Sequence, residues 1–219
     1  MKKGWVGFFA VLFVSVLTGL SAGQANAYNT AITYDLNIAN DQLVSTYSGI
    51  TYDFDVNTPV FSGDGAVVQG TTGSYAAPYA VSNADSSKYL AVPSAASTGS
   101  VTINLGVLYS YLGIWWGSVD KYNTLSLYKG SALAATISGS TIISSNWGNQ
   151  SSSDSNIYLN ISEITGGFDS IRLTSDGRAF EVDNITVGNP VPIPAAAWLL
   201  GSGLVGLAGV RRRKASMLD

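Results

Sequence analysis

Apolar and polar residues alternate with a period of two along several short stretches in the middle of the chain, and turn-forming residues separate them. This pattern predicts strands at residues 101–105, 125–128, 133–137, 157–162, 171–173 and 179–187. Asp176 and Gly177, between the last two stretches, are typical of hairpin turns, so we expect those strands to pair. No sustained apolar period of 3.6 residues occurs there, so the sequence predicts an all-β domain over residues 28–189, an antiparallel, jelly-roll-like β-sandwich.

Residues 1–27 have the parts of a secretory signal peptide. Two lysines follow Met1, an uncharged apolar run covers residues 5–20, and a stretch of small residues ends at Ala25 and Ala27, spaced as signal peptidase requires. Cleavage after Ala27 would leave a mature chain that begins at Tyr28. The alternative is an uncleaved N-terminal membrane anchor.

The C-terminal end has three parts. A proline-rich stretch, residues 190–194, is expected to be extended because proline disfavours helix in the residue before it. Residues 195–210 carry no charge and would rise about 24 Å as a helix, slightly short of a hydrocarbon core of ~30 Å. They predict a transmembrane helix, and the basic residues of the tail, 211–219, place that tail in the cytoplasm and the acidic middle region outside the membrane. A plain tail anchor and a buried core helix are the alternatives.

This C-terminal end resembles the PEP-CTERM sorting tail of exported proteins of Gram-negative bacteria. The sorting motif is Val191, Pro192, Ile193 and Pro194, and it is followed by the apolar run and the basic end. Ile193 stands where the main pattern has glutamate, so the motif is similar to the variant subgroup reading Val-Pro-Leu-Pro-Ala. The resemblance implies processing by exosortase, a membrane-embedded, cysteine transpeptidase-like enzyme.

Two stretches of the middle region, residues 112–124 and 179–185, are similar to a family of exosortase-dependent surface proteins. In that family a β-sandwich precedes the sorting tail. The resemblance implies the same order of domains here, and it implies no particular activity.

Charge and composition exclude several classes of function. The 219-residue chain has 11 basic and 14 acidic residues, and residues 28–189 hold five basic residues against thirteen acidic ones, a balance of −8. Such a surface repels phosphate backbones, so we expect no nucleic-acid partner. The chain has no histidine and no cysteine, which excludes thiol nucleophiles, thiolate metal sites and disulfides. Carboxylate chemistry and hard, oxygen-ligated cations remain.

Three tryptophans are candidates for stacking on a sugar ring: Trp115, Trp116 and Trp147. Trp115 and Trp116 are neighbours on a predicted strand, so only one of them can face the core. The other would offer a flat apolar face and a polar edge, which suits a sugar. The alternative is ordinary packing beneath a loop.

Two pairs of acidic residues should each share one strand face, Asp53 with Asp55 and Glu181 with Asp183. Carboxylates on one face repel each other unless a cation lies between them. Ca²⁺, which takes roughly six to eight oxygen ligands, would suit Glu181, Asp183 and Asn184 as a structural site. The alternative is a solvated acidic face. No pair can be assigned as the acid and nucleophile of a glycosidase, so we expect no enzyme.

The sequence therefore predicts an exported protein that passes through the inner membrane to the cell surface or a biofilm matrix. Signal peptidase and exosortase are the expected partners, and the β-domain is expected to be non-catalytic structural cargo. The alternative is a lectin-like module that binds exopolysaccharide. An exposed tryptophan beside a polar groove would favour that second function.

Overall fold

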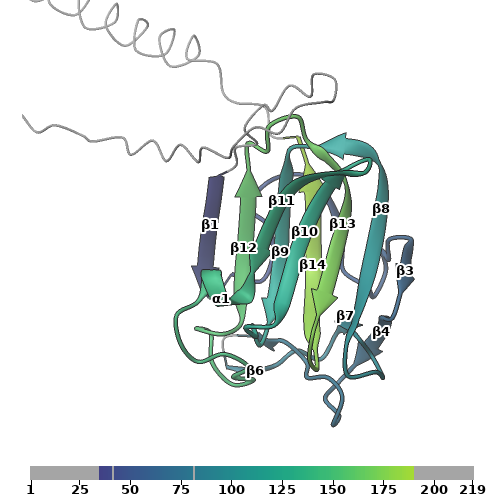
Figure 1. Cartoon of the computed structure of the whole chain (residues 1–219). Coiled ribbons are helices and arrows are strands. Elements are labelled where there is room, and N and C mark those ends of the chain that lie inside the picture. The colour runs from purple at the N-terminus through teal and green to yellow at the C-terminus, as the bar shows by residue number, and fades with distance from the viewer. Residues whose placement is uncertain (1–34, 41, 81, 190–219) are drawn as a thin grey trace, which may run out of the picture. The chain divides into compact units, whose positions relative to one another are not determined.

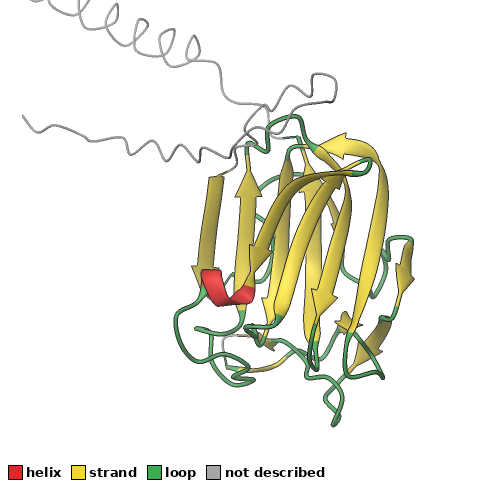
Figure 2. Cartoon of the chain, viewed as in Figure 1, coloured by secondary structure: helices red, strands yellow, loops and turns green. Residues whose placement is uncertain are grey.

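The computed structural model describes residues 35–40, 42–80 and 82–189 (Figure 1). They form fourteen strands and one short helix: β1 (Asp35–Asn40), β2 (Ile50–Tyr52), β3 (Phe61–Gly63), β4 (Ala66–Gln69), β5 (Tyr79–Ala80), β6 (Asn83–Ala84), β7 (Lys88–Val92), β8 (Gly99–Tyr109), β9 (Tyr111–Gly117), β10 (Asn123–Lys129), β11 (Ala132–Ser138), α1 (Gly139–Ile142), β12 (Ile157–Ser162), β13 (Phe168–Ser175) and β14 (Phe180–Gly188). The predicted all-β class is confirmed, as is the minor place of helix (Figure 2).

The signal peptide, sorting motif, transmembrane helix and basic tail expected at residues 1–27, 190–194, 195–210 and 211–219 lie outside the described residues. Within residues 35–40, 42–80 and 82–189, no helix has the length and apolar character needed to cross a membrane.

Two antiparallel sheets make up the fold. The first has the strand order β1-β12-β9-β14-β7-β4, and β2 pairs with the second half of β14. The second has the order β11-β10-β13-β8-β3, and β5 and β6 form a separate two-stranded ribbon. The six strands expected from alternation correspond to β8, β10, β11, β12, β13 and β14, so the periodicity located them correctly.

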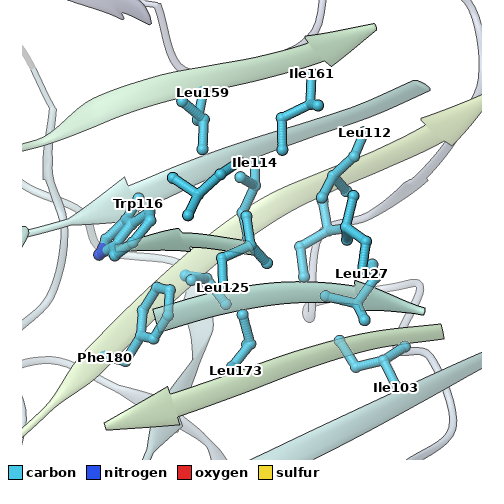
Figure 3. Packing of buried hydrophobic residues seen from close by; sticks show 14 of the residues in the cluster. Ile103, Leu112, Ile114, Trp116, Leu125, Leu127, Leu159, Ile161, Leu173 and Phe180 are labelled. Atoms are coloured by element: carbon cyan, nitrogen blue, oxygen red, sulfur yellow. The ribbon is translucent and has the colours of Figure 1, made fainter. Parts of the chain in front are cut away.

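The two sheets share one hydrophobic core (Figure 3). Alternate residues of the central strands point into it, including Leu112, Ile114 and Trp116 from β9 and Leu125 and Leu127 from β10. Each such aliphatic side chain, when fully buried, stabilises the fold by about 1.5–3 kcal/mol. This shared core is the arrangement of a β-sandwich.

The turn at Asp176 and Gly177 joins the two sheets, and this corrects the hairpin expected from the sequence. β13 pairs with β10 and β8, whereas β14 pairs with β9, β7 and β2 in the other sheet. An Asp-Gly dipeptide specifies only that the chain reverses. β14 instead joins the other sheet, where both its edges pair with neighbouring strands and both its faces are covered.

The outer face of the seven-stranded sheet is also covered over its central strands β12, β9 and β14, which the alternation does not predict. The ring of Tyr47 packs on that of Tyr111 with centroids 4.5 Å apart, and Tyr89 is fully buried beside Ala77. Every residue of β14 is buried except Asn184, which is half-buried. Polar residues on this outer face are therefore enclosed by loops.

The strand register fixes the two ends of the seven-stranded sheet. Asp35 pairs with Ser162 of β12, and the facing ends of β9 and β14 pair as Tyr111 with Gly188. The start of β1 and the end of β14 therefore lie at one end of the sheet, which we call the tail end. Glu181 pairs with Gly117 at the opposite end, which we call the distal end.

Candidate functional site

A pocket of about 180 Å³ opens at the distal end, and we call it the distal pocket. Four segments meet there: the loop after β4, the β9–β10 connection, the loop after α1, and the start of β14. The lining residues are Thr72, Gly73, Ser74, Tyr75, Ala76, Ser118, Asp120, Tyr122, Gly148, Gln150, Arg178, Ala179 and Glu181.

Glu181 forms the buried floor of the distal pocket. It lies on the outer face of β14 and is 1% exposed. Its Oε1 accepts a hydrogen bond from the backbone N–H of Ala76 (2.9 Å), and its Oε2 accepts one from the Ser118 hydroxyl (3.1 Å). Burial raises the pKa of Glu181 to about 7; the two hydrogen bonds oppose the rise, and the nearby charge of Asp120 adds to it.

Asp120 and Tyr122 form the side wall. The Tyr122 hydroxyl lies 2.7 Å from Oδ2 of Asp120 and 2.5 Å from the backbone carbonyl oxygen of Arg178. Burial raises the pKa of Asp120, while the hydrogen bond from Tyr122 lowers it. Burial also raises the pKa of Tyr122, and its hydrogen bond to Asp120 and the charge of that carboxylate act in the same direction.

Gly148 brings a third loop against Asp120. Its N–H donates to the carbonyl oxygen of Val119 (2.9 Å), and its φ of +67° lies in the left-handed region. A Cβ on Gly148 would come within 2.7 Å of Asp120 Oδ1. Only glycine meets both conditions without a shift of the backbone or of the carboxylate.

Asn156, which is 2% exposed, ties the loops of the pocket together. Its Oδ1 accepts from the backbone N–H groups of Ser118 (2.8 Å) and Tyr79 (2.9 Å). Its Nδ2 donates to the carbonyl oxygens of Asn149 and Ser152, both at 2.9 Å. One buried amide thus links the β9–β10 connection, the start of β5 and the loop after α1.

Tyr75 supplies an aromatic wall. Its ring meets that of Tyr89 edge-on, with centroids 6.2 Å apart and an interplanar angle of 77°. The Tyr89 hydroxyl donates to the carbonyl oxygen of Gly70 (2.6 Å), which fixes the loop that carries Tyr75. The ring therefore has a defined position at the pocket.

Arg178, which lines the pocket, and Lys121, next to it, direct their cationic groups to other partners. The guanidinium of Arg178 donates to the carbonyl oxygens of Ala95 and Ala96, each at 3.1 Å. The Lys121 Nζ lies 3.9 Å from the centroid of the Trp147 ring. Among the described residues, no lysine or arginine nitrogen is bonded to the carboxylates of Asp120 or Glu181.

The structure separates the three candidate tryptophans. Trp116 faces the core and stacks on Phe180 with centroids 4.2 Å apart, and Trp115 faces the other way, so the expectation that only one faces the core is confirmed. Trp115 is nevertheless only 2% exposed, so neither ring offers a face to a sugar. Trp147 is half-buried, with Lys121 over its ring.

Glu181, Asp183 and Asn184 bond to three different segments. Glu181 turns toward the distal pocket. Asp183 Oδ1 accepts a hydrogen bond from the backbone N–H of Asn184 (2.7 Å), and Asp183 Oδ2 lies 3.5 Å from the Ser87 hydroxyl. Asn184 sits in a bulge with a φ of +48°, and its side chain donates to the carbonyl oxygen of Leu43 (3.0 Å). Within the described ranges, no three acidic side chains are grouped to hold a metal ion. Calcium binding itself is untested, but the separate partners of these three side chains argue against a joint site.

The alternative of a solvated acidic face is wrong for Glu181 and Asp183, because each is 1% exposed. Burial raises the pKa of Asp183 to about 8, and the charges of Asp85, Asp55 and Asp53 add to the effect. The chain folds loops over this face, which strand alternation does not reveal.

The expectation that Asp53 and Asp55 share a strand face is also wrong, since β2 ends at Tyr52. Asp53 Oδ1 accepts from the N–H groups of Val56 (2.9 Å) and Asn57 (2.8 Å). This local turn competes with the strand.

Most of the pocket was not among the sequence-predicted site residues. Glu181 was predicted from the sequence, but as a calcium ligand and not as part of a pocket. Ser118, Asp120 and Tyr122 lie in a short polar connection between two apolar strands, which is a signal for a functional loop. Tyr75 and Asn156 carry no local signal, because their place at the pocket depends on pairing of distant segments.

Comparison with known protein families, with characterised proteins and with solved structures gives no match.

Proposed function

We propose that this chain is an exported bacterial surface or matrix protein that exosortase processes through its C-terminal tail. Its cargo is a non-catalytic, jelly-roll-like β-sandwich between a signal peptide and a transmembrane helix. The observation that supports this proposal is the relation between the ends of the fold: β1 begins at Asp35 and β14 ends at Gly188, both at the tail end.

This relation matters because both proposed cleavage sites lie outside the described strands. Cleavage after Ala27 precedes β1, and the sorting motif begins at Val191, just after β14. Processing at either site would remove no strand of either sheet. A precursor held at both ends in one membrane would also direct its distal end, and the distal pocket, away from that membrane.

The experiment follows the fate of the precursor in a Gram-negative host that contains exosortase. Replacing Pro192 and Pro194 together by alanine allows helix to extend upstream and removes the recognition element. The double variant should stay at the inner membrane with nearly the precursor mass. Pro190→Ala is the matched control, since it changes a neighbouring proline outside the motif, and it should mature like the parent. A double variant that matures and leaves the membrane would refute exosortase processing.

A second candidate function, binding of exopolysaccharide, is favoured by one observation. The distal pocket combines an aromatic wall at Tyr75 with hydrogen-bonding groups on several loops, which is how proteins hold small polar ligands. The site differs from the tryptophan platform expected from the sequence. It lies at the distal end of the sandwich, opposite the tail end.

A further inference from the structure

We propose that the distal pocket binds a single six-membered sugar ring that carries an ammonium group, as an amino sugar residue does. The proposal deepens the function proposed above and rests on it for the source of the ligand, an extracellular polysaccharide.

The two carboxyl groups of the pocket favour a cationic ligand. Asp120 and Glu181 both line it, and the charge of Asp120 adds to the cost of ionising Glu181. Arg178 and Lys121 are close in sequence to these acids, but their cationic groups are engaged with carbonyl oxygens and with an indole ring. A ligand ammonium would supply the missing positive charge.

The hydrogen bonds of the side wall also lack a donor. The Tyr122 hydroxyl is within hydrogen-bond distance of two acceptors, Asp120 Oδ2 and the Arg178 carbonyl oxygen, yet a phenol carries one proton. Without a ligand, the two acceptors share that single proton. An ammonium group has three N–H donors, so one can donate to Asp120 and leave the phenolic proton to the Arg178 carbonyl oxygen, while another reaches toward Glu181.

The size of the pocket fits one ring. Its volume, about 180 Å³, is somewhat larger than an engineered cavity of roughly 150 Å³ that accepts benzene. It is smaller than the pockets of roughly 300 Å³ and above that take larger organic ligands. A single six-membered ring with short substituents is the matching class.

The lining specifies a polar ring. Thr72, Ser74 and Gln150 bring hydroxyl and amide groups to the pocket, and Tyr75 brings a flat apolar face held by Tyr89. Sugar rings have this pairing of an apolar face with hydroxyl edges, whereas hydrocarbon rings would leave the polar lining unpaired. The buried amide of Asn156 holds the loops in this arrangement in advance, which reduces the entropy lost on binding.

The test is calorimetric titration of the purified full chain at neutral pH, in a polyoxyethylene detergent that carries no sugar. The probe is glucosamine, and glucose is the matched neutral probe because it replaces the amino group with a hydroxyl. We expect glucosamine to bind. Glucose should bind at least about tenfold more weakly, or not at all, because a hydrogen-bonded charge is lost.

Variants then locate the binding. Glu181→Gln and Asp120→Asn keep the side-chain shapes and should each weaken glucosamine binding by about tenfold or more. Glu163→Gln is the matched control, since it makes the same change on an exposed residue at the tail end, and it should bind like the parent. Thermal melts of all three variants establish that they are folded, and the comparison of glucosamine with glucose needs no variant.

Three results would overturn the proposal: glucose binding as tightly as glucosamine, unchanged binding in both pocket variants, or a Glu181-dependent Ca²⁺ response without glucosamine binding. The last result would assign the pocket to a metal ion. Because binding is measured on purified protein, its failure would leave exosortase processing untouched, and failure of the proline experiment would leave the pocket untouched.

Discussion

The Tyr122 hydroxyl and the Asp120 carboxylate lie 2.7 Å apart, and they share a single phenolic proton with the carbonyl oxygen of Arg178. Both side chains are partly buried, and burial raises the pKa of each. This pair links the β9–β10 connection to the β13–β14 connection. Tyr122 therefore joins a carboxyl group of the distal pocket to the connection through which the chain passes from one sheet to the other.

Removing the Tyr122 hydroxyl should destabilise the fold. Tyr122→Phe leaves Asp120 and the Arg178 carbonyl oxygen without their common donor, which costs about 1–3 kcal/mol of unfolding free energy. Urea unfolding of the full chain in detergent measures the change. Tyr128→Phe is the control, because that half-buried hydroxyl has no hydrogen bond among the described residues. Equal losses in the two variants would contradict the shared-proton arrangement.

Stability should fall as pH rises from about 5 to about 8. The pKa of Glu181 rises on folding from 4.5 to about 7, and that of Asp183 from 3.8 to about 8. Between these values the folded state holds protons that the unfolded state lacks, so the unfolding free energy decreases with pH, by about 1.4 kcal/mol per pH unit for each group. The contribution is complete below the unfolded pKa values and lost above the folded ones. Denaturant unfolding at pH 5, 6.5 and 8 measures it.

Glu181→Gln should remove part of that dependence. Its uncharged amide cannot ionise in the buried site, so the variant should gain about 3 kcal/mol relative to the parent between pH 5 and pH 8. Glu163→Gln changes an exposed acid and should follow the parent at every pH. Parallel pH profiles for the parent and Glu181→Gln would show that this carboxyl ionises normally.

The sandwich should fold without either end. Residues 28–189, produced alone, hold every described strand and the shared core. We expect one cooperative unfolding transition by circular dichroism, with the same midpoint whether tryptophan fluorescence or ellipticity is followed. Two transitions, or no cooperative loss of structure, would mean that the terminal segments are part of the fold.

Calcium should leave the melting curve unchanged. The candidate ligands Glu181, Asp183 and Asn184 bond to separate segments, so they do not present a joint set of oxygens. Melts in chelator and in millimolar Ca²⁺ should superimpose. A midpoint raised by several degrees, and abolished by Asp183→Asn, would instead establish the calcium site, because a bound ion stabilises the folded state.

Alternation along the chain was enough to locate the strands of the core. Leu125 and Leu127 alternate with polar residues, and β10 buries both of them against the other sheet. The same rule places Trp115 and Trp116 on opposite faces of one strand. Strand periodicity is a local geometric property, since successive side chains must point to opposite faces.

The sequence by itself thus determined the fold class, the excluded chemistries and the resemblance of the two ends to export signals. The tertiary structure decided which sheet received β14, why Trp115 is buried although it faces away from the core, and how Glu181 reached a pocket with Asp120. These outcomes depend on loops that come from distant parts of the chain to cover the outer face, such as the one that carries Ala76. Alternation along a strand predicts which face of the sheet a side chain lies on. Only the packing of remote segments decides whether that outer face is exposed to solvent.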